Sequence, residues 1–212
     1  MSDLVKKTRR LGRPPKDVSG YNESREALLQ AGVEILTEKG FSSSGIDEIL
    51  RRVGVPKGSF YHFFGSKEVF GAELVTRYAA YFACKLDRFL LDKTIPPLQR
   101  LRNFTADARS GMARHEFKRG CLIGNLGQEM GTLPESFREQ LRAVFHDWQA
   151  RVAHCFEEAK ACGEMGEMSD CHQLAATFWI GWEGAVLRAK LDGTPEALDL
   201  FADFFFSSLS RK

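Results

Sequence analysis

Five residues in one short segment carry the side chains that bind a nucleic-acid backbone. Between Lys57 and Phe63 the chain has a cation, a glycine, a hydroxyl, a phenol and an imidazole, namely Lys57, Gly58, Ser59, Tyr61 and His62. This mixture is unsuited to a protein core, but its N–H and O–H groups can bond phosphate oxygens and base edges. The missing side chain of Gly58 would let a partner approach the backbone closely. These residue types and this spacing indicate a DNA-binding surface.

Two short helices joined by a tight turn are expected to position this segment. The first, residues 45–53, follows a run of serines that can cap its free N–H groups, and it has apolar residues at helical spacing. Gly54 breaks it, and Pro56 suits the first turn of a second helix over residues 57–63. Such a helix-turn-helix places its second helix in the DNA major groove. The backbone N–H groups of Ser44 and Gly45, at the start of the first helix, are expected to hold a phosphate.

The segment from Ser24 to Glu68 resembles the TetR-type one-component transcriptional repressors, without a gap. The matching features are the entry helix 24–39 with its Gly40-Phe41 stop, Ile46-x-x-Ile49, the run 55–64, and Ser66-Lys67-Glu68 at the start of the next helix. The resemblance implies an all-α, TetR-like homodimer of about nine helices per chain. An N-terminal three-helix helix-turn-helix DNA-binding domain would precede a C-terminal helical ligand-binding and dimerisation domain.

The resemblance and the side-chain chemistry together assign roles within this segment. Lys57, Gly58 and Ser59 would enter the groove first, Tyr61 and His62 would bond phosphates, and Lys67 would bond a flanking phosphate. Phe60 and Phe63 are expected in the core. The family mode is repression, and a symmetric dimer would present two recognition helices to a palindromic operator of double-stranded DNA.

Positive charge is concentrated near the N-terminus, although the formal net charge of the chain is only +2. Basic residues outnumber acidic ones over residues 1–67, and the reverse holds for the rest. The first sixteen residues hold six cations against Asp3 alone. Arg13, in Gly12-Arg13-Pro14-Pro15, lies in a sequence similar to the Arg-Gly-Arg-Pro type that occupies A·T minor grooves, with Leu11 in place of the first arginine. Residues 1–20 are therefore interpreted as a basic arm that reaches the minor groove, or as a solvated tail with non-specific affinity.

The remaining sequence predicts helices throughout, with no strand pattern and no repeat. We expect a helix-turn-helix domain over 21–67 and a ligand-binding and dimerisation domain over 68–212. The expected helices after the recognition helix are 66–91, 96–115, a short one between 120 and 131, 134–161, 171–191 and 195–210. The helix 66–91 would cross from one domain to the other and link them mechanically.

The last two helices have more apolar surface than one chain needs. Helix 171–191 is apolar nearly all round between residues 174 and 187, with only Thr177 and Glu183 polar. Helix 195–210 presents Leu198, Phe201, Phe204, Phe205 and Leu209. Gly181, Gly184 and Ala185 would let another helix approach closely. The prediction is that these two helices form the homodimer interface; an ordinary internal core is the alternative.

Cys121 is the residue that could react with a ligand. It falls at the start of the short sixth helix, where the helix dipole and nearby Lys118, Arg119 and His115 would favour a thiolate. The Gly-Cys-Leu motif, Leu126-x-x-Glu129 and the run from Trp182 to Lys190 resemble a TetR subgroup that responds to electrophiles and small unsaturated compounds such as acrylate, quinones or aldehydes. Lys190 would be the cationic partner of Cys121 or hold a ligand carboxylate. The alternative is that Cys121 is a small buried apolar residue and Lys190 a solvated helix end.

A ligand pocket is expected between the fifth, seventh and eighth helices, lined by aromatic and a few polar side chains. The candidates are Phe104, Asn125, Trp148, Phe178, Trp179 and Trp182, with Arg109 or Lys190 as the cation for a small anion. The predicted function is a ligand-released repressor. The alternative is a DNA-binding regulator without a small effector, controlled by a protein partner.

Several other classes are disfavoured. No stretch is long and apolar enough to span a membrane, and the basic N-terminus lacks the apolar segment of a signal peptide. The odd number of cysteines, five, argues against a secreted disulfide scaffold and for a cytoplasmic protein. His154, Cys155, Cys162, Cys171 and His172 match no compact metal motif, so no metal or cofactor is expected. No nucleophile elbow, P-loop or dinucleotide fingerprint occurs, so no enzymatic activity is expected.

Overall fold

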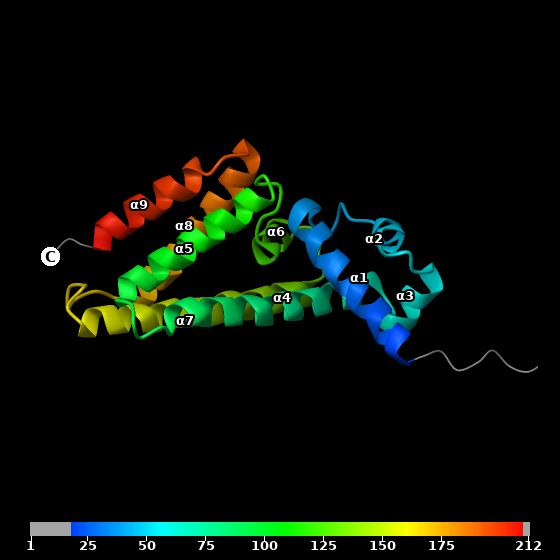
Figure 1. Cartoon of the computed structure of the whole chain (residues 1–212), viewed down its shortest axis with the longest axis horizontal. Helices are drawn as coiled ribbons and strands as arrows, with labels where there is room; N and C mark the ends of the chain where they lie inside the picture. Colours follow the sequence, from blue (N-terminus) through cyan, green and yellow to red (C-terminus); the bar gives the residue numbers. More distant parts are fainter. Residues whose placement is uncertain (1–17, 210–212) are drawn as a thin grey trace, which may run out of the picture.

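The chain folds into helices only over the residues that the structure describes. The computed structural model describes residues 18–209, which form nine α-helices and no strand (Figure 1). The helices are α1 (Val18–Lys39), α2 (Ile46–Val53), α3 (Lys57–Phe64), α4 (Lys67–Leu90), α5 (Pro97–Arg114), α6 (Leu122–Gln128), α7 (Glu135–Ala161), α8 (Cys171–Asp192) and α9 (Glu196–Leu209). The all-α prediction is confirmed. Arg13 and most of the predicted arm lie outside the described residues.

The largest difference from the sequence prediction is at the start of α1, which begins at Val18 and not at Ser24. The hydroxyl of Ser24 does not cap the helix; its Oγ donates to the backbone oxygen of Gly20, one turn earlier, at 2.9 Å. A serine inside a helix can satisfy its hydroxyl in this way, so it gives no start signal. The expected boundary of the arm at residue 20 therefore falls inside α1.

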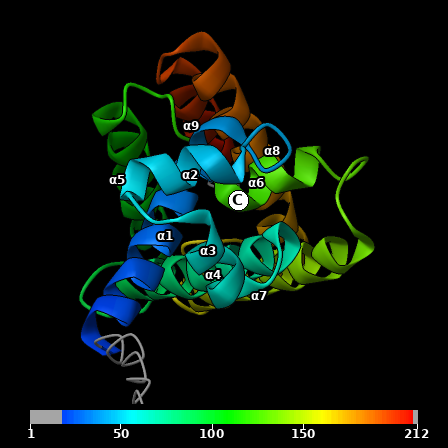
Figure 2. The same ribbon diagram turned by 90° about the vertical axis from the view of Figure 1, so that its right-hand side faces the viewer.

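The first three helices form one end of the molecule, the end that faces the viewer in Figure 2. α2 ends at Gly54, whose positive φ of 72° places it in the left-handed region and lets its N–H bond the oxygen of Leu50. Pro56 then starts α3. Phe60 and Phe64 on the inner side of α3 are buried against α1 and the start of α4, where Phe70 contacts both rings. This core fixes the outward face of α3.

The long helix α4 connects this end to the rest of the chain (Figure 1). Ser66 caps it by accepting a hydrogen bond from the N–H of Val69 at 3.1 Å. Near its start Gly71 lies under Phe41 and Phe137, and a Cβ there would come within 2.4 Å of the Phe41 ring. Farther on, α4 packs against α5 and α7. The same helix therefore belongs to both halves of the molecule, as the sequence predicted.

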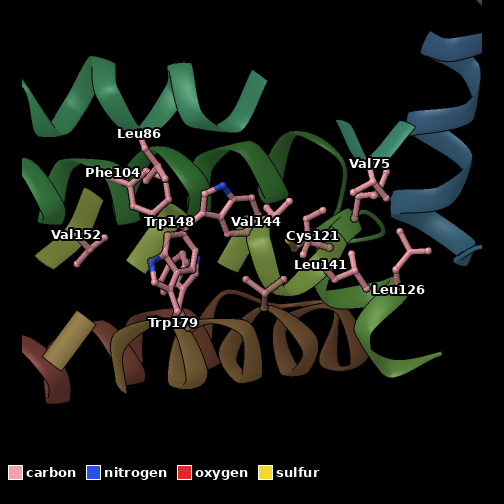
Figure 3. Packing of buried hydrophobic residues seen from close by; sticks show 14 of the residues in the cluster. Val75, Leu86, Phe104, Cys121, Leu126, Leu141, Val144, Trp148, Val152 and Trp179 are labelled. Carbon is pink, nitrogen blue, oxygen red and sulfur yellow. The ribbon is translucent and has the colours of Figure 1, made fainter. Parts of the chain in front are cut away.

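The C-terminal helices enclose a core rich in aromatic rings (Figure 3). Trp148 of α7 and Trp179 of α8 have ring centroids 5.0 Å apart, and Phe104 of α5 lies 6.1 Å from Trp179. All three are essentially inaccessible to solvent. Their edge-to-face and tilted ring contacts tie α5, α7 and α8 together. Among the described residues, no helix has the length and hydropathy needed to cross a membrane.

Candidate DNA-binding face and ligand cavity

The outward face of α3 presents the side chains that the sequence singled out. Lys57, Gly58, Tyr61 and His62 are exposed, and Ser59 is half-buried. A Cβ added to Gly58 would meet no atom within 4 Å, so the backbone there is open to a partner. The Lys57 ammonium lies 3.0 Å from the Asp47 carboxylate of α2, an exposed pair that water and salt screen.

Two other predicted phosphate contacts are engaged inside the protein. Ser44 is buried: its N–H donates to the oxygen of Phe41 and its hydroxyl to the oxygen of Gly40. The ammonium of Lys67 donates to the oxygen of Phe41 at 2.8 Å and lies 4.4 Å above the Phe41 ring. Burial lowers the pKa of this lysine. Both residues stabilise the loop between α1 and α2, whereas Gly45 keeps an open position at the start of α2.

A cavity of about 610 Å³ lies between α1, α4, α5, α8 and the loop that leads into α6. Its lining includes apolar side chains, four cations and three groups that can exchange a proton with a neighbour, Tyr78, Cys121 and Glu183. The predicted pocket was expected between α5, α7 and α8. The structure instead moves it toward the DNA-binding helices, because aromatic rings fill the expected space.

Four predicted ligand residues are core residues for that reason. Phe104, Trp148, Phe178 and Trp179 are all buried and pack on one another. None of them lines the cavity, whereas Cys121 and Trp182 do. The indole N–H groups of Trp148 and Trp179 have no hydrogen-bond partner among the described residues.

The three predicted polar ligand residues also lie elsewhere. Arg109 of α5 makes a bidentate ion pair with Asp199 of α9, with N–O distances of 2.6 and 3.0 Å. The Asn125 amide donates to the oxygens of Leu36 and Thr37 at 3.0 and 2.9 Å. Lys190 donates to the oxygen of Glu38 at 2.6 Å and to that of Thr37 at 3.3 Å. Asn125 and Lys190 therefore bind the last turn of α1 and are not free for a ligand.

Cys121 begins α6 as predicted, but its protonation is the opposite of the one expected. Burial, and then the nearby Glu183 carboxylate, raise the pKa of the Cys121 thiol well above its usual value. The expected cations do not offset this, since Lys118 pairs with Glu116 and Arg119 with Glu34. The resting side chain is therefore a neutral thiol.

Glu183 and Tyr78 are two cavity residues that sequence reasoning did not assign. Glu183 shares a hydrogen bond with Cys121, and burial raises the pKa of its carboxyl group to about 7. Tyr78 of α4 hydrogen-bonds the same sulfur, and burial raises the pKa of its hydroxyl group. The signal for Glu183 was present: it is an acidic residue in an otherwise apolar stretch of α8.

No metal site competes with this interpretation in the part of the chain that the structure describes. No group of three or more His, Cys, Asp or Glu side chains is arranged to hold an ion there. His154 and His172 instead lie near Glu157.

The fold and these two sites define a helix-turn-helix protein with a cavity beside its first helix, and comparison with known proteins identifies its family. Residues 28–74 match the family described as "Bacterial regulatory proteins, tetR family". Residues 97–205 match "Tetracyclin repressor-like, C-terminal domain". The chain belongs to the TetR family of transcriptional regulators.

Its similarity to particular members extends over most of the chain. It is 53% identical over 196 residues to the transcriptional regulator AcuR of Cereibacter sphaeroides, covering 92% of this chain and 89% of that one. It is 28% identical over 178 residues to the transcriptional repressor NemR of Escherichia coli, covering 84% and 89%. A crystal structure of a regulatory protein TetR from Rhodobacter sphaeroides is 54% identical, with a TM-score of 0.85 over 87% of this chain and 97% of that one. The resemblance drawn from the sequence is confirmed.

Proposed function

We propose that this protein is a repressor that binds a palindromic operator as a homodimer and leaves it when a small ligand occupies the cavity. The observation that carries the proposal is the position of the cavity, which is bounded by Val33, Glu34 and Thr37 of α1 as well as by α5 and α8. A ligand there would touch α1, the first helix of the DNA-binding end, directly. If the ligand binds one position of α1 more tightly than another, this difference in ligand affinity would change the operator affinity.

The end of α1 is held by groups from the C-terminal half. The backbone oxygen of Thr37 accepts hydrogen bonds from the N–H of Gly120 at 3.0 Å, from Asn125 and from Lys190. Gly120 precedes Cys121 in the cavity wall. A ligand that displaces this loop would therefore displace α1, and with it the recognition helix α3.

An unpaired apolar stripe on α8 and α9 supports the dimer. Ile180, Leu191, Leu200 and Phe204 are each between 72 and 75% exposed, and Leu187 is 42% exposed. Gly184 lies in the same stripe, and a Cβ there would meet nothing within 4 Å. Gly181 does not serve this purpose, since Phe201 of the same chain covers it. Large exposed apolar residues gathered on one face mark an interaction surface, and a twofold axis there would pair each helix with its copy.

The composition of the cavity wall favours a small ligand with an anionic or carbonyl end and an unsaturated end. Arg77, Lys85 and Arg119 line it but are paired with acidic residues. Arg114 also lines it, and no ion pair among the described residues engages it. It is thus better placed than Arg109 or Lys190 to bind a carboxylate. Cys121 lies among the other lining residues, so acrylate or a related unsaturated carboxylate or aldehyde suits the site.

Fluorescence anisotropy tests the proposal. Labelled DNA from immediately upstream of the protein's own gene is titrated with protein, and acrylate is then added. Tight, salt-sensitive binding that acrylate reverses supports a ligand-released repressor. Tight binding that neither acrylate nor an unsaturated aldehyde changes would contradict this effector class and would favour control by a protein partner.

A further inference from the structure

The strongest unassigned feature is the group of side chains around the sulfur of Cys121. The thiol lies at the N-terminus of α6, where the N–H of Gly124 approaches its Sγ at 3.5 Å and the N–H of Ile123 also bonds it. The Tyr78 hydroxyl, from α4, bonds the same sulfur. Three donors from two helices therefore surround one sulfur atom, and each would bind a thiolate more strongly than a thiol.

The carboxylate that can take the thiol proton among these contacts is Glu183 of α8. Its carboxyl group bonds Cys121, and no ion pair among the described residues involves it. Gly124 makes room for this carboxyl group: a Cβ at that position would lie 2.0 Å from Glu183 Oε2. The absence of a side chain one turn after Cys121 thus lets an acid from another helix reach the sulfur.

A carboxylate that lies beside a thiol and has no ion-pair partner does not stabilise a resting thiolate, because its charge opposes a second negative charge. It is arranged to accept a proton when the thiol reacts. Burial raises the pKa of Glu183 to about 7, which makes it a stronger base than an exposed glutamate and leaves it partly ionised at neutral pH. The three donors would then stabilise the sulfur as its proton leaves.

We propose that Glu183 is the general base of Cys121, and that the two residues with Tyr78 form a reaction site for a small α,β-unsaturated carbonyl compound in the cavity. This inference rests on the proposed function and specifies its chemistry. As the sulfur bonds the β-carbon, its proton passes to Glu183 and the π-electron pair moves to the α-carbon. Glu183 then returns the proton to the α-carbon. A thiol and an alkene give one thioether, and nothing is oxidised or reduced.

The test measures the rate of adduct formation at Cys121 with acrolein, by mass spectrometry of peptides from the intact, full-length protein. Glu183→Gln retains the size of the side chain but cannot take the proton, so the rate at Cys121 should fall about 100-fold. Glu183→Asp should recover part of it. The exposed Cys84 and Cys162 are internal controls whose rates should not change. Circular dichroism and operator affinity verify that each variant folds.

The opposing interpretation gives the opposite result. If Glu183 acts only through its charge, its removal lowers the pKa of the thiol and Cys121 reacts faster in Glu183→Gln. A rate at Cys121 equal to or above that of the wild type would therefore overturn the proposal, as would an unmodified Cys121 in the wild type. The pH profile adds a second criterion: the wild-type rate should rise near pH 7 as Glu183 ionises, and this rise should be absent from Glu183→Gln.

Operator release by acrylate, measured on the same preparations, separates the two hypotheses. If acrylate does not release the wild type from DNA but Cys121 reacts slowly in Glu183→Gln, the proposed effector is wrong and Glu183 remains the general base. If acrylate releases the wild type normally but the Cys121 rate is unchanged in Glu183→Gln, Glu183 is not the general base and the ligand-released repressor remains supported.

Discussion

Glu129, the residue that ends α6, accepts a hydrogen bond from the backbone N–H of Phe41 at 2.9 Å through one carboxylate oxygen. Its other oxygen accepts from Ser42 at 2.7 Å. These two donors lie in the loop between α1 and α2, 88 and 87 residues away along the chain. Gly40, immediately before them, has a φ of 82° and leaves no room for a Cβ beside the same carboxylate. The C-terminal half thus holds the helix-turn-helix by a further contact, beyond the continuous helix α4 and the hydrogen bonds to the end of α1.

Glu129→Ala should therefore weaken both stability and communication. Two backbone N–H groups lose a charged acceptor, which should lower the free energy of unfolding by about 2 kcal/mol. The ratio of operator affinities without and with effector should also decrease, because α6 is no longer connected to the loop between α1 and α2 through Glu129. Urea unfolding and anisotropy measure the two effects. Glu139→Ala removes an exposed glutamate from α7 and serves as the matched control; equal behaviour of the two variants would contradict the role of Glu129.

Lys57→Ala and Tyr61→Ala should each weaken operator binding without lowering the free energy of unfolding. Both side chains are exposed on the outer face of α3, so their loss creates no cavity. A lost phosphate contact from Lys57 should also reduce the slope of log affinity against log salt by about 1. Lys93→Ala, in the loop between α4 and α5 at the opposite end of the molecule, is the control (Figure 1). Unchanged operator affinity in both α3 variants would refute the assignment.

The helices were predictable from the sequence because most of their ends carry local signals. Gly54 with Pro56, Gly193 and the cap at Ser66 each act within a few residues, and all end or begin a helix as expected. The start of α1 lies at Val18, earlier than the predicted Ser24, which is inside the helix and donates its hydroxyl to the oxygen of Gly20. Local patterns therefore gave the elements and most of their limits.

The cavity was not predictable in the same way, because its walls come from distant parts of the chain. Cys121 and Lys190 lie in two separate segments that resemble the same subgroup, and Lys190 was expected beside the thiol. In the structure Lys190 binds the end of α1, whereas Glu183, seven residues before Lys190, forms a hydrogen bond with the thiol. Glu183 and Lys190 both lie on α8, about two turns apart, and only the packing of α1 and α6 decides which of the two reaches the sulfur. Likewise, four aromatic residues predicted to line the pocket fill the core. Aromatic composition alone cannot distinguish residues that line a cavity from residues that pack in the core.

A charge in the exposed stripe of α8 or α9 should prevent dimerisation. Ile180→Asp and Phe204→Asp place a carboxylate where a partner helix would cover it, and an unpaired charge buried at an interface costs several kcal/mol. Sedimentation velocity should show a monomer, and the operator affinity should fall at least about 100-fold because one recognition helix must bind alone. Met168→Asp changes a residue that is 97% exposed in the loop before α8 and should behave as the wild type. Dimers in both stripe variants would place the interface elsewhere.

Glu183 should make the stability of the protein fall as the pH rises through neutrality. Burial raises the pKa of its carboxyl group to about 7 in the folded chain, against an ordinary value of 4.5. The folded state therefore binds the proton more tightly than the unfolded state, and this advantage is present in full below the unfolded pKa and lost as the pH passes through 7. At pH 8 the folded protein holds a partly buried carboxylate that no ion pair among the described residues engages. Glu183→Gln should then raise the free energy of unfolding by about 2 kcal/mol at pH 8 and by far less at pH 5. Urea unfolding at the two pH values measures this, and Glu139→Gln, on an exposed glutamate, should show no such difference. A Glu183→Gln variant that is less stable than the wild type at pH 8 would mean that the ionised carboxylate has a compensating partner.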